Sequence, residues 1–255
     1  MKPLVYVTGA SSGIGAALAG QYHQRGWRLA LVARRREPLA QLSRDLGADD
    51  AWIAAADVQD SATIMATGRA CIAECGLPGV VIANAGISVG MDTADAADIA
   101  VMAEVFATNT IGMAATFQPF LAPMRAQASG TLVGVTSVAG VRGLPGHGAY
   151  CGSKAAAIAY LESLRGECRG SGVRVVTLVP GYVRTPLTAA NRYAMPFLMT
   201  PEAFAQRAVT AIARADSWRV IPWQMGVVAA LMRVLPNPLF DRLAAGRGRK
   251  QRRQE

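Results

Sequence analysis

A tyrosine and a lysine, Tyr150 and Lys154, stand four residues apart in a stretch of helical character. This spacing places both side chains on one face of a helix, a turn apart. A phenol has a pKa of about 10, which makes it a poor acid–base catalyst near neutral pH. A neighbouring ammonium favours the phenolate and lowers that pKa. The pair therefore predicts proton exchange between Tyr150 and a carbonyl or carbinol oxygen.

A serine, Ser137, comes directly after an apolar run that predicts a strand over 131–136. Open α/β folds bind their ligands at the carboxyl ends of the strands. We therefore expect the Ser137 hydroxyl to bind the substrate oxygen, with the capping of a turn as its alternative role.

A glycine-rich turn, Thr8-Gly9-Ala10-Ser11-Ser12-Gly13-Ile14-Gly15, follows the first predicted strand and leads into helical periodicity. Glycines allow a tight turn there and let backbone N–H groups approach a pyrophosphate at a helix N-terminus. Such a cluster is weak evidence alone, but its place at the first strand–helix junction strengthens it. We predict a dinucleotide site formed by Gly9, Ser11, Ser12, Gly13, Ile14 and Gly15.

The residues after the second predicted strand are basic: Ala33-Arg34-Arg35-Arg36. Folds that bind NAD place an acidic residue near this point, against the ribose 2′-hydroxyl, whereas a guanidinium group suits a 2′-phosphate. We predict NADP(H) as cofactor, with Arg34 as the leading contact and Arg35 as the second. A solvated basic turn is the alternative.

Short β-type runs alternate with longer helical stretches, which is typical of βαβ units around a parallel sheet. The predicted strands are 4–8, 28–33, 51–56, 80–83, 131–136, 174–178 and 219–221, and the predicted helices are 14–24, 62–75, 99–124, 149–169 and 201–215. The pattern predicts an α/β fold, a Rossmann-type doubly wound parallel sheet of about seven strands with helices on both faces and a C-terminal amphipathic extension. We expect one nucleotide-binding, catalytic domain over 1–222, with 223–255 either part of it or peripheral.

These motifs, in this order, resemble the classical short-chain dehydrogenase/reductase family from about residue 3 to about residue 221. Thr8 to Gly15 is similar to the family's T-G-x-x-x-G-x-G turn, and Pro180 to Thr185 is similar to its P-G-x-V-x-T. The other matching pieces are Asp57-Val58, Asn84-Ala85-Gly86, Asn109, Ser137, Tyr150 and Lys154.

The resemblance implies a role for each matching residue. Tyr150 would be the general acid/base, Ser137 the donor to the substrate oxygen, and Lys154 both the charge that lowers the phenol's pKa and a ribose ligand. Asn109 would hold a water that links Lys154 to solvent. The remaining implied cofactor contacts are Tyr150 itself, Asp57 and Val58 near the adenine, Asn84, Ala85 and Gly86 centrally, and Pro180, Gly181, Val183 and Thr185 at the nicotinamide.

These expectations describe an NADP(H)-dependent oxidoreductase that interconverts a carbonyl and a secondary alcohol. The alternative is a catalytically weak regulatory protein that senses NADP(H).

The segment after Thr185 would be the substrate lid, and it is mostly apolar. Its apolar residues are Leu187, Tyr193, Met195, Phe197, Leu198 and Met199, and its strongly polar residues are Asn191 and Arg192. Such a wall favours a hydrophobic ketone or aldehyde, unless the segment packs on a neighbouring subunit. We interpret His147 as a loop residue at the pocket mouth.

The composition excludes a disordered chain, because 52% of the 255 residues are hydrophobic and 17% are charged. The net charge is +9, and residues 242–255, with six Lys/Arg and one Glu, contribute +5 of it. We expect this basic tail to be a solvated end, with contact to anionic lipid or nucleic acid as the alternative. The tail lacks interleaved aromatic residues, so we predict no nucleic-acid partner. The four cysteines show no zinc-ligand spacing, and we predict no metal.

The chain after residue 222 is apolar up to Leu235 and then basic. Such a segment can lie on an anionic membrane, cover a subunit interface or roof the active site. Pro222, Gln224 and Arg233 interrupt 220–235, which is too short and too broken for a membrane span. Without a secretory signal pattern at the start, we expect a cytoplasmic protein, or one peripheral at the inner face of a membrane. The family resemblance also implies a homodimer or homotetramer that pairs through 99–124 and 149–169.

Overall fold

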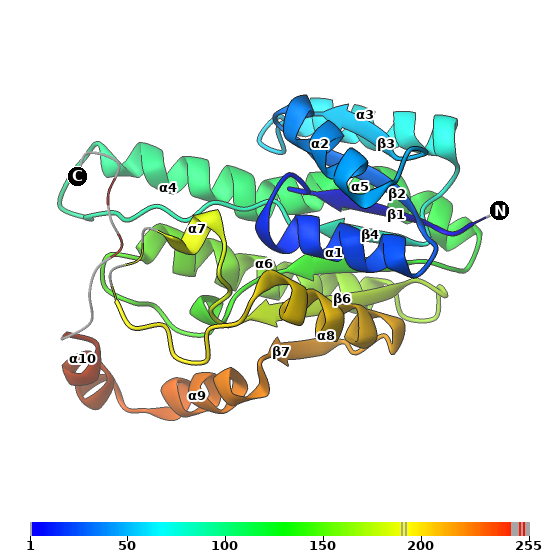
Figure 1. Ribbon diagram of the computed structural model, residues 1–255. Helices are drawn as coiled ribbons and strands as arrows, with labels where there is room; N and C mark the ends of the chain where they lie inside the picture. The colour runs from blue at the N-terminus through cyan, green and yellow to red at the C-terminus, as the bar shows by residue number, and fades with distance from the viewer. Residues whose placement is uncertain (1, 190, 192, 246–249, 251, 253–255) are drawn as a thin grey trace.

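The computed structural model describes residues 2–189, 191, 193–245, 250 and 252, and its centre is a parallel sheet of seven strands (Figure 1). The strand order is β3-β2-β1-β4-β5-β6-β7. The order reverses direction between β1 and β4, which is the topological switch point where doubly wound folds bind ligands. The strands are β1 Leu4–Thr8, β2 Arg28–Ala33, β3 Trp52–Ala55, β4 Val80–Ala83, β5 Thr131–Val135, β6 Arg174–Pro180 and β7 Trp218–Ile221.

The central strands are buried along their whole length, as their continuous apolar sequences require. Every residue of β1, β4 and β5 is buried. Strands covered by helices on both faces read as apolar runs rather than as alternating patterns. This confirms the predicted Rossmann-type α/β fold.

Helices cover both faces of the sheet and enclose a separate apolar core on each (Figure 1). One core includes Leu18 of α1, Leu39 of α2 and Phe204 of α8. The other includes Phe120 of α5 and Leu161 of α6. The α-helices are α1 Gly13–Gln24, α2 Arg36–Leu46, α3 Ser61–Cys75, α4 Asp98–Phe106, α5 Gly112–Ala126, α6 Gly148–Glu167, α7 Pro186–Ala189, α8 Pro201–Ala213, α9 Trp223–Val234 and α10 Asn237–Ala245.

The predicted helix over 99–124 is a continuous helix, Asp98–Ala126, in which a π-helical turn, η1 Ala107–Ile111, separates α4 from α5. In the described part of the chain, this 29-residue helix is the one that is long and apolar enough to cross a membrane by length and composition alone. It packs against α3 and α6. Its apolar residues, such as Phe117 and Phe120, are part of the core.

Helix α2 is absent from the predicted helices, and this omission was an error. Its sequence is dominated by charged and polar residues, so its apolar face is narrow, with Leu39 and Ser43 buried. Gly47 ends the helix in the left-handed conformation at φ 63°, which glycine adopts without a steric penalty. The apolar residues of α2 nevertheless fall on one face of the helix, so its amphipathic period was present in the sequence and was overlooked because the segment as a whole is polar.

Candidate active site

The carboxyl ends of the strands surround a cleft of about 310 Å³. Most of the predicted site residues line it. From the cofactor set these are Gly9, Ser11, Ser12, Gly13, Ile14, Arg34, Arg35, Val58, Asn84, Ala85, Gly86, Pro180, Gly181, Val183 and Thr185, and from the catalytic set Ser137, Tyr150 and Lys154. Motifs that are far apart in the sequence, from the glycine turn at Gly9 to Thr185, therefore lie around one cleft.

Three predicted site residues, Gly15, Asp57 and Asn109, do not line the cleft. Gly15 packs under the glycine turn, and the Asp57 carboxylate accepts a hydrogen bond from the Gln59 N–H at 3.0 Å. In this arrangement Asp57 shapes the loop after β3.

The cleft also includes residues that the motif analysis missed: Ala33, Ala56, Ile87, Thr108, Val135, Thr136, Pro186 and Thr188. Most are small or apolar residues at strand ends, which carry no chemical signal. Thr188 has a clear local role, because its hydroxyl donates to the Val183 carbonyl at 2.7 Å and accepts from the Thr185 N–H at 3.0 Å. It therefore shapes the segment that carries Val183 and Thr185.

The glycine turn is held against the end of β4 by hydrogen bonds. The Asn84 amide donates to the carbonyls of Thr8 and Gly9 at 3.0 and 3.2 Å. The Thr8 hydroxyl in turn accepts from the backbone N–H groups of Asn84 and Ala85 at 3.2 and 3.3 Å. Asn84 therefore supports the turn, which fits its predicted place in the central cofactor region.

The turn has the backbone geometry of a phosphate cradle. Gly9 and Gly13 have φ values of 65° and 55°, a region that residues with a side chain rarely adopt. Ser12 precedes α1 and makes no side-chain cap there within the described residues. The N-terminal N–H groups of α1 thus suit an anionic ligand.

Substituting Gly15 by alanine is expected to destabilise the protein by about 1–3 kcal/mol and to weaken binding of the dinucleotide cofactor. A Cβ at Gly15 would lie 2.2 Å from the Gly9 carbonyl oxygen and 2.6 Å from the Asn84 amide nitrogen. Thermal unfolding and cofactor titration measure both effects. Gly20 on the same helix is the matched control, because a Cβ there has 3.4 Å to its nearest neighbour, the Leu46 side chain. Gly20→Ala should stabilise the helix slightly, and equal effects at both positions would contradict the prediction.

Three of the predicted catalytic residues, Ser137, Tyr150 and Lys154, lie just after β5 and on α6. Ser137 follows β5, and its hydroxyl oxygen accepts from the Ala139 N–H at 3.1 Å. Tyr150 and Lys154 lie on the first turns of α6, and Lys154 is buried. The Lys154 ammonium donates to the Val135 carbonyl at 2.9 Å and lies 5.9 Å from the centre of the Tyr150 ring.

Burial controls the acid–base properties of this pair. It raises the pKa of Tyr150 to about 12, against the opposite effect of its hydrogen bond with Ser137. Burial also lowers the pKa of Lys154 to about 8. The pKa of Tyr150 therefore lies above its ordinary value in this arrangement, because desolvation of the phenolate outweighs the other effects, and a lowering of that pKa by Lys154 stays a prediction. Tyr150 is protonated at neutral pH, which suits donation of a proton to a carbonyl oxygen.

Asn109 lies in the π-helical turn η1, fully buried. Its amide accepts from the Ile87 N–H at 2.9 Å and donates to the Ile87 carbonyl at 3.0 Å and to the Ser153 hydroxyl at 2.9 Å. A Cβ on Gly86 would lie 3.1 Å from the Asn109 amide oxygen and 3.4 Å from the Lys154 ammonium. Because Gly86 has no side chain, the Asn109 amide and the Lys154 ammonium can both lie close to its Cα. A water that links Asn109 and Lys154 stays a prediction.

The electrostatics of the cleft suit a polyanionic cofactor. Arg34 and Arg35 are exposed and line the cleft, and none of the described lining residues is acidic. Arg36, by contrast, donates to the Ile53 carbonyl at 3.0 Å. A cleft lined by cations concentrates an anionic ligand, so these residues fit a phosphorylated dinucleotide.

The predicted lid is partly anchored by aromatic contacts. The Tyr193 ring packs on Tyr182 and His147 with centroid distances of 6.3 and 5.7 Å. His147 lies in a loop, as predicted, but it is buried and outside the cleft lining, and burial lowers its pKa. Leu187 lines the cleft, whereas Phe197 and Leu198 are exposed. Arg192 lies outside the described residues.

Two described residues of the basic tail fold back onto the molecule, although we expected a solvated end. The Lys250 ammonium donates to the Leu187 carbonyl at 3.0 Å and to the Asn191 side chain at 2.6 Å, so it contacts the lid. Arg252 pairs with Asp95 and, at 2.9 Å, with Asp98 at the start of α4. Arg247, Arg249 and Arg253, on which the prediction of a solvated tail also rested, lie outside the described residues.

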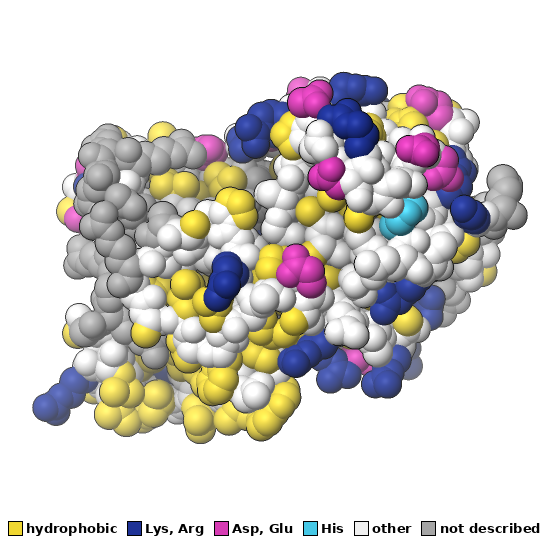
Figure 2. Space-filling view, in the orientation of Figure 1, with side chains coloured by type: hydrophobic (Ala, Val, Ile, Leu, Met, Phe, Trp, Pro, Cys, Tyr) yellow, Lys and Arg dark blue, Asp and Glu magenta, His cyan; other side chains and the backbone are white. Residues whose placement is uncertain are grey.

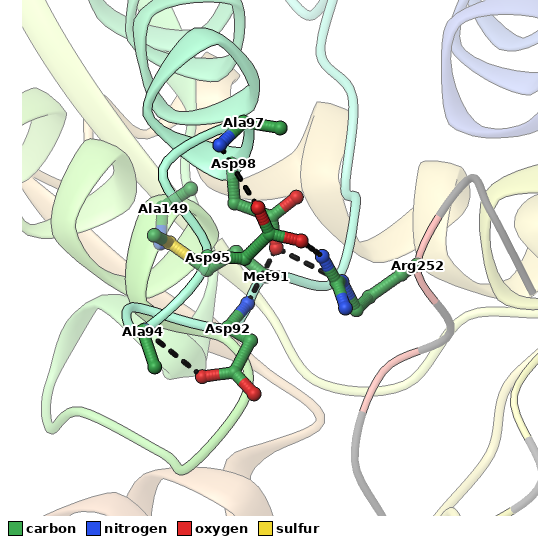
Figure 3. A network of polar contacts seen from close by, with 8 residues as sticks. All are labelled: Met91, Asp92, Ala94, Asp95, Ala97, Asp98, Ala149 and Arg252. Atoms are coloured by element: carbon green, nitrogen blue, oxygen red, sulfur yellow. Dashed lines mark hydrogen bonds and ion pairs between the residues drawn. The ribbon is translucent and has the colours of Figure 1, made fainter.

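The contacts of Arg252 connect the tail to the helix that carries Tyr150 (Figure 3). The Asp98 carboxylate also accepts from the Asp92 N–H at 2.6 Å, and the neighbouring Met91 sulfur accepts from the Ala149 N–H at 3.1 Å. The guanidinium of Arg252 holds the pKa of Asp95 below its ordinary value. The tail, α4 and the start of α6 are thus joined by one polar network.

Comparison with known proteins identifies the family of this chain. Residues 3–195 match the family model for short chain dehydrogenases. The chain belongs to the short-chain dehydrogenase/reductase family. A curated relative, an uncharacterized oxidoreductase of Myxococcus xanthus, is 40% identical over 240 residues, which are 93% of this chain and 94% of the relative.

Solved structures have the same fold. An alcohol dehydrogenase from Thermococcus sibiricus, complexed with 5-hydroxy-NADP, has a TM-score of 0.77 at 24% identity and covers 87% of this chain and 96% of its own. A short-chain dehydrogenase/reductase from Burkholderia phymatum in complex with NAD has a TM-score of 0.81 at 24% identity, covering 91% and 92%. The present short-chain dehydrogenase/reductase is an oxidoreductase acting on CH–OH and C=O groups with a nicotinamide cofactor.

Proposed function

We propose that this enzyme is an NADP(H)-dependent reductase of a hydrophobic ketone or aldehyde. The observation that carries the cofactor assignment is the exposed pair Arg34 and Arg35 on a cleft whose described lining has no acidic residue. Guanidinium groups bind phosphate through charge-assisted hydrogen bonds. The cleft therefore favours a cofactor with a 2′-phosphate over one with a free 2′-hydroxyl.

The substrate class follows from the side of the cleft near Tyr150 and Lys154. Ile87, Val183 and Leu187 line the cleft, whereas Phe197 and Leu198 of the lid are exposed and lie outside this lining. Apolar walls with few polar groups bind apolar ligands and orient them through those few groups. Among the polar groups of this cleft, the hydroxyls of Ser137 and Tyr150 would bind the carbonyl oxygen.

In this mechanism the carbonyl oxygen accepts hydrogen bonds from Ser137 and Tyr150. The reduced nicotinamide, when bound, supplies a hydride to the carbonyl carbon. Tyr150 donates its proton to the oxygen, which completes the alcohol. The positive charge of Lys154 stabilises the resulting phenolate, and Lys154 with Asn109 returns a proton to Tyr150 from solvent.

The test is NADPH consumption at saturating cofactor against ketones and aldehydes of graded hydrophobicity, with NADH in parallel. We expect kcat/KM to rise with apolar size, by about tenfold for each pair of buried methylene groups, and NADPH to be preferred. Small polar sugars turned over in preference to apolar ketones would overturn the substrate class. Tight NADPH binding without turnover of any carbonyl would instead support a protein that senses NADP(H).

We further propose a cytoplasmic homodimer or homotetramer. Helices α4 and α6 contact each other, and the long helix exposes Ile99, Met102 and Ile111 to solvent. Exposed apolar side chains on one long helix are typical of a subunit interface.

A further inference from the structure

We propose that helices α9 and α10 bind this enzyme to an anionic membrane surface. The described chain exposes thirteen large hydrophobic side chains, and seven of them lie between residues 218 and 243. Figure 2 shows hydrophobic side chains gathered along the face of the molecule formed by these helices. The seven are Trp218, Trp223, Val227, Leu231, Val234, Leu239 and Leu243.

The exposed residues of α9 form a stripe on one side of the helix. Trp223, Val227, Leu231 and Val234 follow one another at intervals of four, four and three residues, and their exposed fractions run from 50% to 77%. Residues at this spacing lie on one helix face. The opposite face is already occupied, because Met225 packs with Val138 and Val179. The stripe therefore remains exposed to solvent, while the opposite face of α9 packs on the rest of the fold.

The position of α9 and α10 is fixed by contacts with the loop after η2 (Val138–Gly140). The Arg142 guanidinium donates to the Met232 carbonyl, to the Leu235 carbonyl at 2.6 Å and to the Asn237 side chain at 2.8 Å. It also stacks 3.8 Å over the Phe240 ring. Helices α9 and α10, which carry the exposed residues, are thus held in place by Arg142.

The charge next to the stripe selects an anionic surface. A hollow of about 370 Å³ beside Trp223 is lined by Arg207, Arg214 and Arg219. Its one acidic residue, Asp216, pairs with Arg219 at 2.9 Å, which leaves a net positive lining. Figure 2 shows Lys and Arg side chains gathered over α8 and β7, beside the hydrophobic face. Arginines that flank an apolar stripe with a tryptophan at its start match a lipid surface with phosphate headgroups.

A second copy of the chain fits this face less well. Residues 207–243, which include the hollow and the stripe, contain five arginines and two aspartates, a net charge of +3. A two-fold interface brings the same patch of each copy together, so it would place two surfaces of net positive charge opposite each other. Anionic lipid supplies the missing negative charge.

The experiment measures sedimentation of the full-length enzyme with vesicles of phosphatidylcholine alone and of equimolar phosphatidylcholine and phosphatidylglycerol. We expect binding to the mixed vesicles that falls as salt is raised. Trp223→Ser with Leu231→Ser should weaken it at least about tenfold through lost apolar burial, and Arg207→Gln with Arg214→Gln should remove most of its salt dependence.

Ile99→Ser is the matched control, because Ile99 and Leu231 are both 59% exposed. Because Ile99 also lies on the helix that we propose for subunit pairing, this control is measured on enzyme of the parent's oligomeric mass, and it should then bind vesicles as the parent does. Light scattering of every variant reports its oligomeric state. Three results would overturn the proposal: no preference for anionic vesicles, equal loss in the Ile99 control, or a stripe variant that changes the mass of the oligomer and leaves vesicle binding intact.

Discussion

Replacing Tyr150 by phenylalanine is expected to lower kcat for carbonyl reduction by about 100- to 10,000-fold, the usual contribution of a general acid. Burial keeps the Tyr150 phenol protonated, with its pKa raised to about 12. The substitution removes that proton and leaves the ring that lines the cleft. Steady-state NADPH oxidation gives the loss in kcat, and fluorescence titration should show NADPH binding unchanged within a few-fold.

Tyr160 provides the matched control for this prediction. It lies on the same helix, burial raises its pKa to about 12 as well, and it is outside the cleft lining. Tyr160→Phe should therefore leave kcat near the parent value. Activity of Tyr150→Phe within tenfold of the parent would show that another group donates the proton.

Removing Arg34 and Arg35 together is expected to abolish the preference for NADPH. A charge-assisted hydrogen bond contributes about 1.5–3 kcal/mol, so the Arg34→Ala, Arg35→Ala enzyme should lose about 10- to 100-fold in affinity for NADPH per arginine. The KM for NADH should change little, because NADH has no 2′-phosphate for these side chains to bind. Parallel kinetics with both cofactors measure the two effects.

Arg36→Ala is the control for the loss of a positive charge. Arg36 follows directly in the sequence, but its guanidinium is bound to the Ile53 carbonyl, and it does not line the cleft. The Arg36→Ala enzyme should retain the NADPH preference of the parent enzyme. If all three arginines prove equivalent, a diffuse positive field rather than a 2′-phosphate contact sets the preference.

Sequence alone was sufficient for the features that depend on local chain chemistry. The glycine turn from Thr8 to Gly15 is such a feature, because its backbone conformation requires glycine at Gly9 and Gly13. The buried strands are another, because a continuous apolar run needs cover on both faces. The tyrosine–lysine pair at Tyr150 is a third, since helical spacing places both on one face.

Tertiary structure decided everything that depends on distant neighbours. The pKa of Tyr150 is raised by burial, and burial is a property of the packed fold rather than of a four-residue motif. Asn109 lies in a π-helical turn, but the apolar sequence of the long helix around it shows no sign of that turn. The tail contact of Arg252 with Asp95 joins residues 157 positions apart. Patterns along the chain encode conformation and amphipathicity, whereas desolvation and long-range ion pairs exist once distant segments have packed together.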